Sequence, residues 1–150
     1  MSTFGFGSEI ADEVLYAELS GLTAVTAAVG TNILGRSAVV QGDTLPALMF
    51  YAESSAYDPP GFSGDSIGLE TLRYVVRVIC TGDSTDPIRA AALAQRQHLN
   101  GVAFNTVVDA QNYQVRFDAE GAFPLTFLVD QGITYRQLGT VYSVYVTLGG

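Results

Sequence analysis

The sequence contains no lysine, no tryptophan, one cysteine and one histidine. The absence of lysine excludes a phosphate-binding loop of the GxxxxGK type. Cys80 and His98 are too few to build a Cys/His zinc site, which needs several such ligands. Because Cys80 is the sole cysteine, an intramolecular disulfide bond is also excluded.

Charged side chains are scarce as well. They make up 15% of the 150 residues, whereas hydrophobic residues make up 48%, and soluble domains usually carry about 25% charged residues. The net charge of −8 argues against attraction to nucleic-acid phosphates, so we expect no sequence-specific nucleic-acid binding. All seven basic residues are arginine, which is enriched in protein interfaces where lysine is depleted. We therefore expect a partner to cover part of the surface; the alternative is a monomer with a Gly/Ser/Thr-rich surface.

Long apolar runs are missing too. None approaches the roughly 20 residues that a helix needs to cross a bilayer, so we expect a soluble protein without a membrane partner. The start, "MSTFGFGSEIADEV", lacks the basic residues and apolar run of a secretory signal, which predicts folding in a reducing cytoplasm. The length predicts one domain over residues 1–150, with residues 1–7 as a flexible N-terminal extension.

The N-terminal third predicts a helix followed by two strands. Ser8 is the expected N-cap, and a helical apolar face follows: Ala11, Val14, Leu15, Leu19 and Leu22. Gly21 weakens or ends this helix, and "LTAVTAAVG" adds a further helical turn before Gly30. The segments "NILGRSAVVQ" and "LPALMFYAE" then suit strands.

Residues 54–68 are predicted to form a long loop rich in proline and glycine. Loops beyond about 12–15 residues are usually functional or disordered. Tyr57 and Phe62 are aromatic side chains that this loop can present to a partner or fold back onto its own sheet.

The strongest predicted strand is "TLRYVVRVICT", residues 71–81. Leu72, Tyr74, Val76, Val78 and Cys80 alternate along it and are expected to face the core. The other face carries Arg73 and Arg77, about 13 Å apart along a strand. Because this face mixes guanidinium and apolar groups, Arg73 and Arg77 are candidate interface residues, together with Tyr57 and Phe62.

A helix and a run of strands complete the predicted fold. The strands are "YQVRF", "FPLTFLVD", "ITYRQL" and "TVYSVYVTL", with turns expected at residues 118–121, 131–132 and Gly139. Strands so closely spaced favour antiparallel pairing. We therefore predict an α+β fold, in which two main helices pack on one face of a largely antiparallel, possibly mixed, β-sheet.

The segment "GDSTDP" raises the question of a serine nucleophile at Ser84. Such a serine needs a base within hydrogen-bond reach, usually histidine. His98 lies near the far end of the following helix, about 18 Å from the helix start, so the dyad cannot close. The sequence instead predicts a turn in which Asp86 caps the helix and Pro87 occupies its first position.

Other chemical motifs are weak. "GFGSEI" lacks the third glycine of a dinucleotide-binding fingerprint. The acidic pairs Asp83/Asp86 and Asp118/Glu120 lie in turn-like segments, where acids are common without chemistry. We expect no catalytic residue, no metal site and no cofactor, and hence not an enzyme.

Taken in order, the segments resemble the tail terminator, or tail completion, proteins of long-tailed bacteriophages. The resemblance rests on "EVLYAELSGLTAVTAAVG", "LPALMFYAESSAYD", "LRYVVRVICTGDSTDPIRAAALAQRQHLNG" and "GITYRQLGTVYSVYVTL", which together span most of the chain. The extension before Ser8 and the loop around Pro59 have no counterpart in this pattern.

The resemblance implies a structural virion protein that forms a ring, usually a hexamer, on the tail tube. Its implied partners are other copies of itself, the tail tube protein and the head-tail connector, or stopper, protein, with DNA passing through the ring. The implied location is the head-proximal end of the virion tail, after assembly in the host cytoplasm. Alternatives are another neck or connector protein of the virion, or a module that binds a small apolar ligand between sheet and helices.

Overall fold

The computed structural model describes residues 6–37, 43–57, 70–130 and 132–148, with residues 6, 55–57, 123–128 and 130 described by their backbone alone. The helices are α1 (Phe6–Ser20), α2 (Thr23–Val29) and α3 (Asp86–Leu99). The strands are β1 (Ile33–Leu34), β2 (Ala47–Tyr57), β3 (Glu70–Thr81), β4 (Val102–Val108), β5 (Gln111–Asp130) and β6 (Ile133–Leu148).

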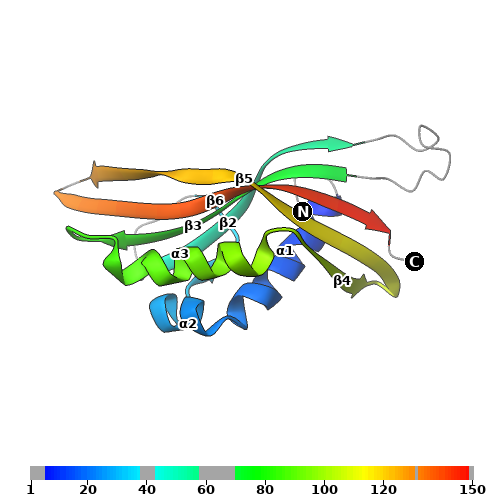
Figure 1. The fold of residues 1–150 in the computed structure, drawn as a ribbon, viewed down its shortest axis with the longest axis horizontal. Helices are drawn as coiled ribbons and strands as arrows, with labels where there is room; N and C mark the ends of the chain where they lie inside the picture. Colours follow the sequence, from blue (N-terminus) through cyan, green and yellow to red (C-terminus); the bar gives the residue numbers. More distant parts are fainter. Residues whose placement is uncertain (1–5, 38–42, 58–69, 131, 149–150) are drawn as a thin grey trace.

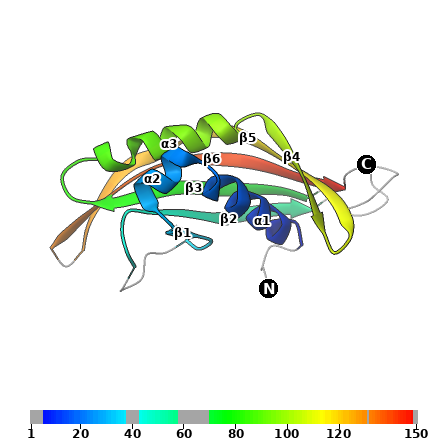
Figure 2. The same cartoon turned by 90° about the horizontal axis from the view of Figure 1, so that it is seen from below.

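The strands form a six-stranded sheet in the order β1-β2-β3-β6-β5-β4. Only β1 pairs in parallel, with β2; every other pairing in the described chain is antiparallel. Figure 1 shows the helices beneath the curled sheet, and Figure 2 shows them in front of it from below. The predicted α+β class with a largely antiparallel sheet is therefore confirmed, with α2 as a short third helix.

The first helix begins earlier than predicted. Ser8 is not its N-cap, because α1 starts at Phe6 and Ser8 is a buried residue inside the first turns. The backbone N–H of Gly7 donates a 2.7 Å hydrogen bond to Oε1 of Glu70, the first residue of β3. This carboxylate takes over the capping that Ser8 was expected to provide, and residues 6 and 7 of the predicted extension belong to α1.

The predicted core faces of α1 and β3 are confirmed except at Leu22, which lies beyond the end of α1 and is half-buried. Ala11, Val14, Leu15 and Leu19 are buried in α1, and Leu72, Tyr74, Val76, Val78 and Cys80 are buried in β3. They share one hydrophobic core with side chains from β2, β5, β6 and α3. On the other face of β3, Val75 and Ile79 are also buried, whereas Arg73 is exposed.

Two of the predicted turns are wrong. Residues 118–121 and Gly139 lie inside the long continuous strands β5 and β6. At Gly121 the pairing register shifts, as in a β-bulge, without ending the strand. At Gly139 the strand approaches its neighbour closely, since a Cβ atom there would lie 2.3 Å from the carbonyl oxygen of Val76. The hairpin near residues 131–132 is present, with Gly132 at φ 80°.

The strand β4 is absent from the sequence prediction. It pairs with β5 through a hairpin whose loop residues, Asp109 and Ala110, both have positive φ. Conversely, the strand expected over residues 32–41 is confined to Ile33–Leu34, and residues 38–42 lie outside the described chain. The predicted loop over 54–68 is shorter at its start, because β2 continues to Tyr57; residues 58–68 are outside the described chain.

Candidate functional site

The candidate site is the outer face of the sheet, which we define by the strand residues whose side chains alternate with the core residues. Its polar members come from four strands: Glu53 (β2), Arg73 and Arg77 (β3), Arg116, Asp118 and Glu120 (β5), and Gln137 and Ser143 (β6). These side chains are distant in sequence, and only the strand pairing brings them together.

Arg73 lies at the centre of a polar row that crosses the sheet. Its Nε atom is 3.3 Å from Oε2 of Glu53 and 3.9 Å from Oε2 of Glu120. Ser143 Oγ donates a 2.9 Å hydrogen bond to the same Glu120 oxygen. The Arg73 side chain remains 52% exposed, and exposed ion pairs contribute at most about 1 kcal/mol each. The guanidinium group is therefore bound within the chain yet still accessible to a partner.

Arg77 is held more firmly. Its Nη1 donates a 2.6 Å hydrogen bond to Oε1 of Gln137 in β6, and its Nη2 donates to the backbone carbonyl of Ser37. The guanidinium carbon also lies 5.7 Å from the centre of the Tyr51 ring, within reach of a cation–π contact. Arg77 thus joins β3 to β2, β6 and the segment after β1.

The structure describes little of the other two candidate interface residues. Tyr57 is the last residue of β2, and only its backbone is described. Phe62 lies outside the described residues. The contacts of Arg73 with Glu53 and Glu120, and of Glu120 with Ser143, were not predicted from the sequence, because they depend on strand register and no local pattern signals them.

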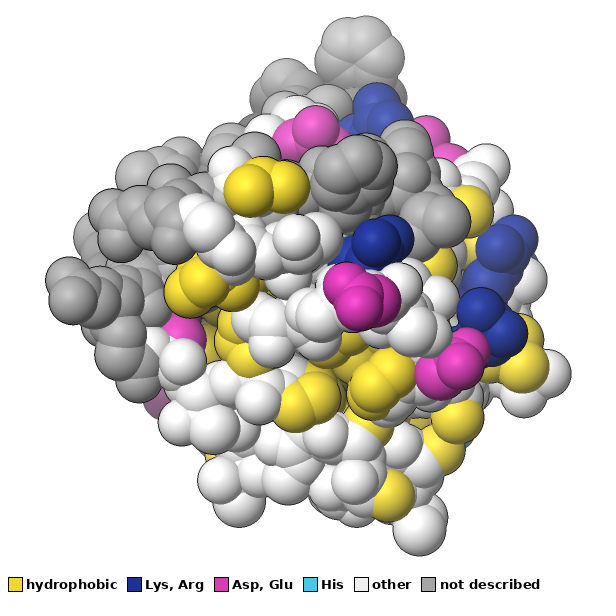
Figure 3. Space-filling view, turned by 90° about the vertical axis from the view of Figure 1, so that its left-hand side faces the viewer, with side chains coloured by type: hydrophobic (Ala, Val, Ile, Leu, Met, Phe, Trp, Pro, Cys, Tyr) yellow, Lys and Arg dark blue, Asp and Glu magenta, His cyan; other side chains and the backbone are white. Residues whose placement is uncertain are grey.

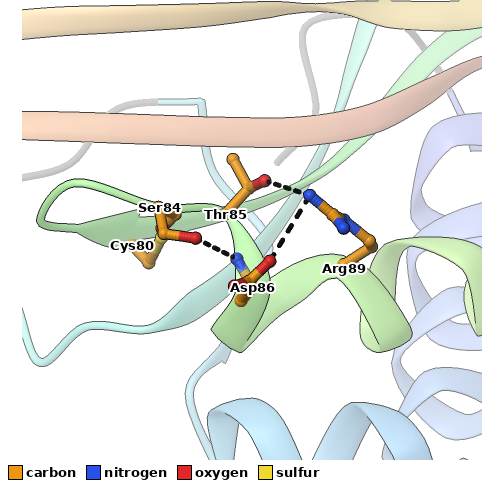
Figure 4. Close-up of polar contacts among 5 residues, drawn as sticks. All are labelled: Cys80, Ser84, Thr85, Asp86 and Arg89. Carbon is orange, nitrogen blue, oxygen red and sulfur yellow. Dashed lines mark hydrogen bonds and ion pairs between the residues drawn. The ribbon is translucent and has the colours of Figure 1, made fainter.

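Ser84 has a structural role in the "GDS" turn (Figure 4). Ser84 Oγ accepts a 3.0 Å hydrogen bond from the backbone N–H of Asp86. The N-cap residue of α3 is Thr85, so the prediction that Asp86 caps the helix is wrong by one position. The carboxylate of Asp86 instead contacts Arg89 at 3.4 Å on the exposed helix surface.

His98 lies in the last turn of α3, at the opposite end from Ser84. Its Nε2 is 2.9 Å from Oε1 of Glu18 in α1, and its ring packs 5.7 Å from that of Phe104. His98 therefore links α3 to α1 and β4, while Ser84 binds its own turn.

Two polar contacts are buried between the sheet and the helices. The Tyr74 hydroxyl lies 2.9 Å from the Ser8 carbonyl and 2.8 Å from Oδ1 of Asp12, and burial raises the pKa of Asp12 and of Tyr74. Farther along, Tyr142 donates a 2.6 Å hydrogen bond to Oε1 of the fully buried Gln95. Burial raises the pKa of Tyr142 as well.

Within the described ranges, no three His, Cys, Asp or Glu side chains gather as metal ligands would. Three of the four acidic residues noted in the sequence have other contacts: Asp86 with Arg89 at 3.4 Å, Asp118 with Arg116 at 3.1 Å, and Glu120 with the Arg73 row. None of the helices in the described chain has the length and apolarity to cross a bilayer.

The surface itself carries few charges. Figure 3 shows the molecule from the left-hand side of Figure 1, the side on which β5 ends and β6 begins. Hydrophobic side chains lie among uncharged polar groups on this face, with only scattered arginine and acidic side chains. Val129 and Ile133, which flank the hairpin turn, are 57% and 46% exposed. Both are apolar side chains left in contact with solvent.

No protein-family model matches the sequence, and no curated protein matches it. Among solved structures, the fold is similar to that of a chain in the structure titled "Virion of native gene transfer agent (GTA) particle". The TM-score is 0.52, the identity is 16%, and the match covers 87% of this chain and 91% of that chain. At this identity the likeness establishes that the two chains share a fold over nearly their whole lengths.

Proposed function

We propose that this chain is a structural protein of a tailed, phage-like virion. The observation that supports it best is the fold shared with a chain of the gene transfer agent virion, which extends over 87% of this chain and 91% of that one. The finer proposal is a tail terminator: a single-domain subunit that forms a hexameric ring between the tail tube and the head connector. This finer role comes from the resemblance of its sequence segments to that family.

The charge distribution fits such a subunit. In the proposed arrangement the helices cover one face of the sheet, and the outer face, with Arg73 and Arg77, contacts neighbouring subunits or the tube. Tyr57 and Phe62 belong to the same proposed interface. A chain with a net charge of −8 and no lysine would not grip DNA that passes through the ring.

The proposed role is not enzymatic. The one serine in a nucleophile-like motif, Ser84, uses its hydroxyl to accept the Asp86 N–H, and the one histidine, His98, contacts Glu18. Both side chains thus have structural partners. We propose that they stabilise the two ends of α3.

The test is assembly on a tail tube. The purified protein should form rings by mass measurement and electron microscopy, either alone or when mixed with tubes that lack their terminator, and should bind one end of the tube. Binding to the head connector but not to the tube would indicate another neck protein. A protein that stays monomeric well above micromolar concentration and binds neither component would contradict a virion role.

Arg77→Glu tests the interface on the outer face. We expect fewer assembled rings, because a carboxylate replaces a guanidinium group of the proposed interface. Since Arg77 also contacts Gln137 and Tyr51 within the chain, circular dichroism and urea unfolding establish that the variant is folded. Arg89→Glu, at an exposed position on α3, is the matched charge reversal and should assemble normally. Equal assembly of both variants would make Arg77 an ordinary surface residue.

A further inference from the structure

β4 is the last strand of the sheet, and it lies at the right-hand end of the molecule in Figure 1. It pairs with β5 on one side, and no strand of the described chain pairs with it on the other. Val102 and Val107 are 37% and 64% exposed. Within the described chain, the outer side of β4 therefore has no strand partner.

β4 also lacks the features that normally protect a sheet edge. Edge strands usually carry charges, proline or bulges, which prevent pairing with another chain. The β4 sequence, "VAFNTVV", has no charged residue and no proline, and its pairing with β5 is regular along its length. By contrast, β5 beyond residue 117 has Pro124 and two register shifts. Of these two segments, β4 is the one without such protection.

The hairpin geometry identifies which backbone groups point outward. A two-residue loop with two positive φ angles, here 51° and 64°, is a type I′ turn. The residues that flank such a turn, Val108 and Gln111, form a hydrogen-bonded pair, and the pattern alternates along the strand. The N–H groups of Ala103, Asn105 and Val107 consequently point away from β5.

We propose that the outer edge of β4 pairs with a strand of a second copy of this chain, at the outer edge of its β2. The inference rests on the proposed ring, which needs two different patches on each subunit. β2 supplies the second patch, because β1 covers only Leu48 and Met49 and leaves residues 50–57 without a strand partner in the described chain. This edge bears one charge, Glu53, which lies at the register shift between Ala52 and Ser54 and is already compensated by Arg73. On both sides of the shift the pairing of β2 with β3 is regular and the residues are uncharged. An uncharged strand such as β4 fits it without leaving a carboxylate unpaired.

Substitutions at Val107 test the pairing. Val107→Pro removes one outward N–H and leaves the β4–β5 hydrogen bonds intact, and Val107→Lys places a charge on the edge without changing the backbone. Both should weaken assembly by about tenfold or more, the effect of losing one hydrogen bond and its packing. Val107→Thr keeps the N–H and the branched shape, and should assemble like the wild type. Circular dichroism and urea unfolding establish that each variant is folded.

A cross-linking experiment identifies the partner strand. In a Cys80→Ser background, Asn105→Cys marks β4 and Ser54→Cys marks β2. A short bis-maleimide should join the two variants only when they are mixed. Cross-linking of Asn105→Cys with itself would overturn β2 as the partner. If folded Val107→Pro and Val107→Lys form rings as well as the wild type, the β4 edge is overturned and the ring stands. If the wild type does not assemble and the mixed cysteine variants do not cross-link, both proposals are overturned.

Discussion

Gly139→Ala in β6 should destabilise the fold more than the same substitution at Gly121 in β5. Gly139 pairs with Arg77 of β3 on one side and Phe123 of β5 on the other. A Cβ atom at this position would lie 2.3 Å from the carbonyl oxygen of Val76 and 2.8 Å from the Cα of Arg77. Both atoms belong to the backbone of a central strand, so the clash cannot be relieved by a side-chain rotation.

The magnitude follows from the cost of overpacking. Inserting a methyl group into a well-packed region typically costs about 1–3 kcal/mol, and we expect about 3 kcal/mol here, because the backbone must move. For a chain of this size that lowers the melting temperature by roughly 6–12 °C. In urea unfolding followed by circular dichroism, the midpoint should fall by roughly 1–2 M. All variants are compared at one protein concentration, since assembly raises apparent stability.

Gly121→Ala is the matched control in the neighbouring strand. A Cβ atom at Gly121 meets no atom within 4 Å, so its free energy of unfolding should change by no more than about 0.5 kcal/mol. If Gly139→Ala and Gly121→Ala unfold at the same midpoint as the wild type, β3 and β6 do not approach closely at Gly139. The strand would then be interrupted there, as the sequence alone predicts.

Three further predictions concern the buried polar contacts. Glu70→Ala removes the acceptor of the Gly7 N–H and should destabilise by about 1–3 kcal/mol, with faster proteolysis of the α1 N-terminus. Tyr142→Phe leaves Oε1 of the buried Gln95 without its 2.6 Å donor and should cost about 1–3 kcal/mol in urea unfolding. Burial raises the pKa of Asp12 above its unfolded value, so its carboxyl group stabilises the fold at low pH and loses that contribution as pH rises through the raised pKa. The stability of the wild type relative to Asp12→Asn should therefore decrease from pH 4 to pH 7, and a constant difference would contradict the burial of this carboxyl group.

The sequence predicts elements well where periodicity is strong and local. The alternation in β3 places Tyr74 and Val78 in the core, and Pro87 after a turn marks the start of α3 within one residue. Gly21 likewise follows the end of α1 at Ser20. In each case the signal lies within a few neighbouring residues, so no tertiary information is needed.

The errors arise where distant residues decide the outcome. Glycine is equally typical of a turn and of a close backbone approach, and only the position of β3 makes Gly139 the latter. The cap of α1 comes from Glu70, which is separated from Gly7 by 63 positions. β4 was missed although Val102, Phe104, Thr106 and Val108 alternate, because its turn, Asp109-Ala110, lacks the glycine that usually marks such hairpins.

The candidate interface shows the same limit. Arg73 and Arg77 were identified from their spacing along one strand, and both do lie on the outer face of β3. Their partners in β2, β5 and β6 depend on strand register, which no local pattern in the sequence reveals. The assembly of Arg77→Glu tests whether this face contacts a neighbouring subunit.

The buried thiol of Cys80 can report local opening of the fold through its rate of chemical labelling. It is 2% exposed, its Sγ donates a 3.5 Å hydrogen bond to the Ser84 carbonyl, and burial raises the pKa of the thiol. Alkylating reagents reach it only when the end of β3 separates from the turn before α3, and no competing cysteine obscures the signal. The rate of thiol labelling in free and assembled protein therefore measures how much association restrains this end of the sheet, without any engineered probe.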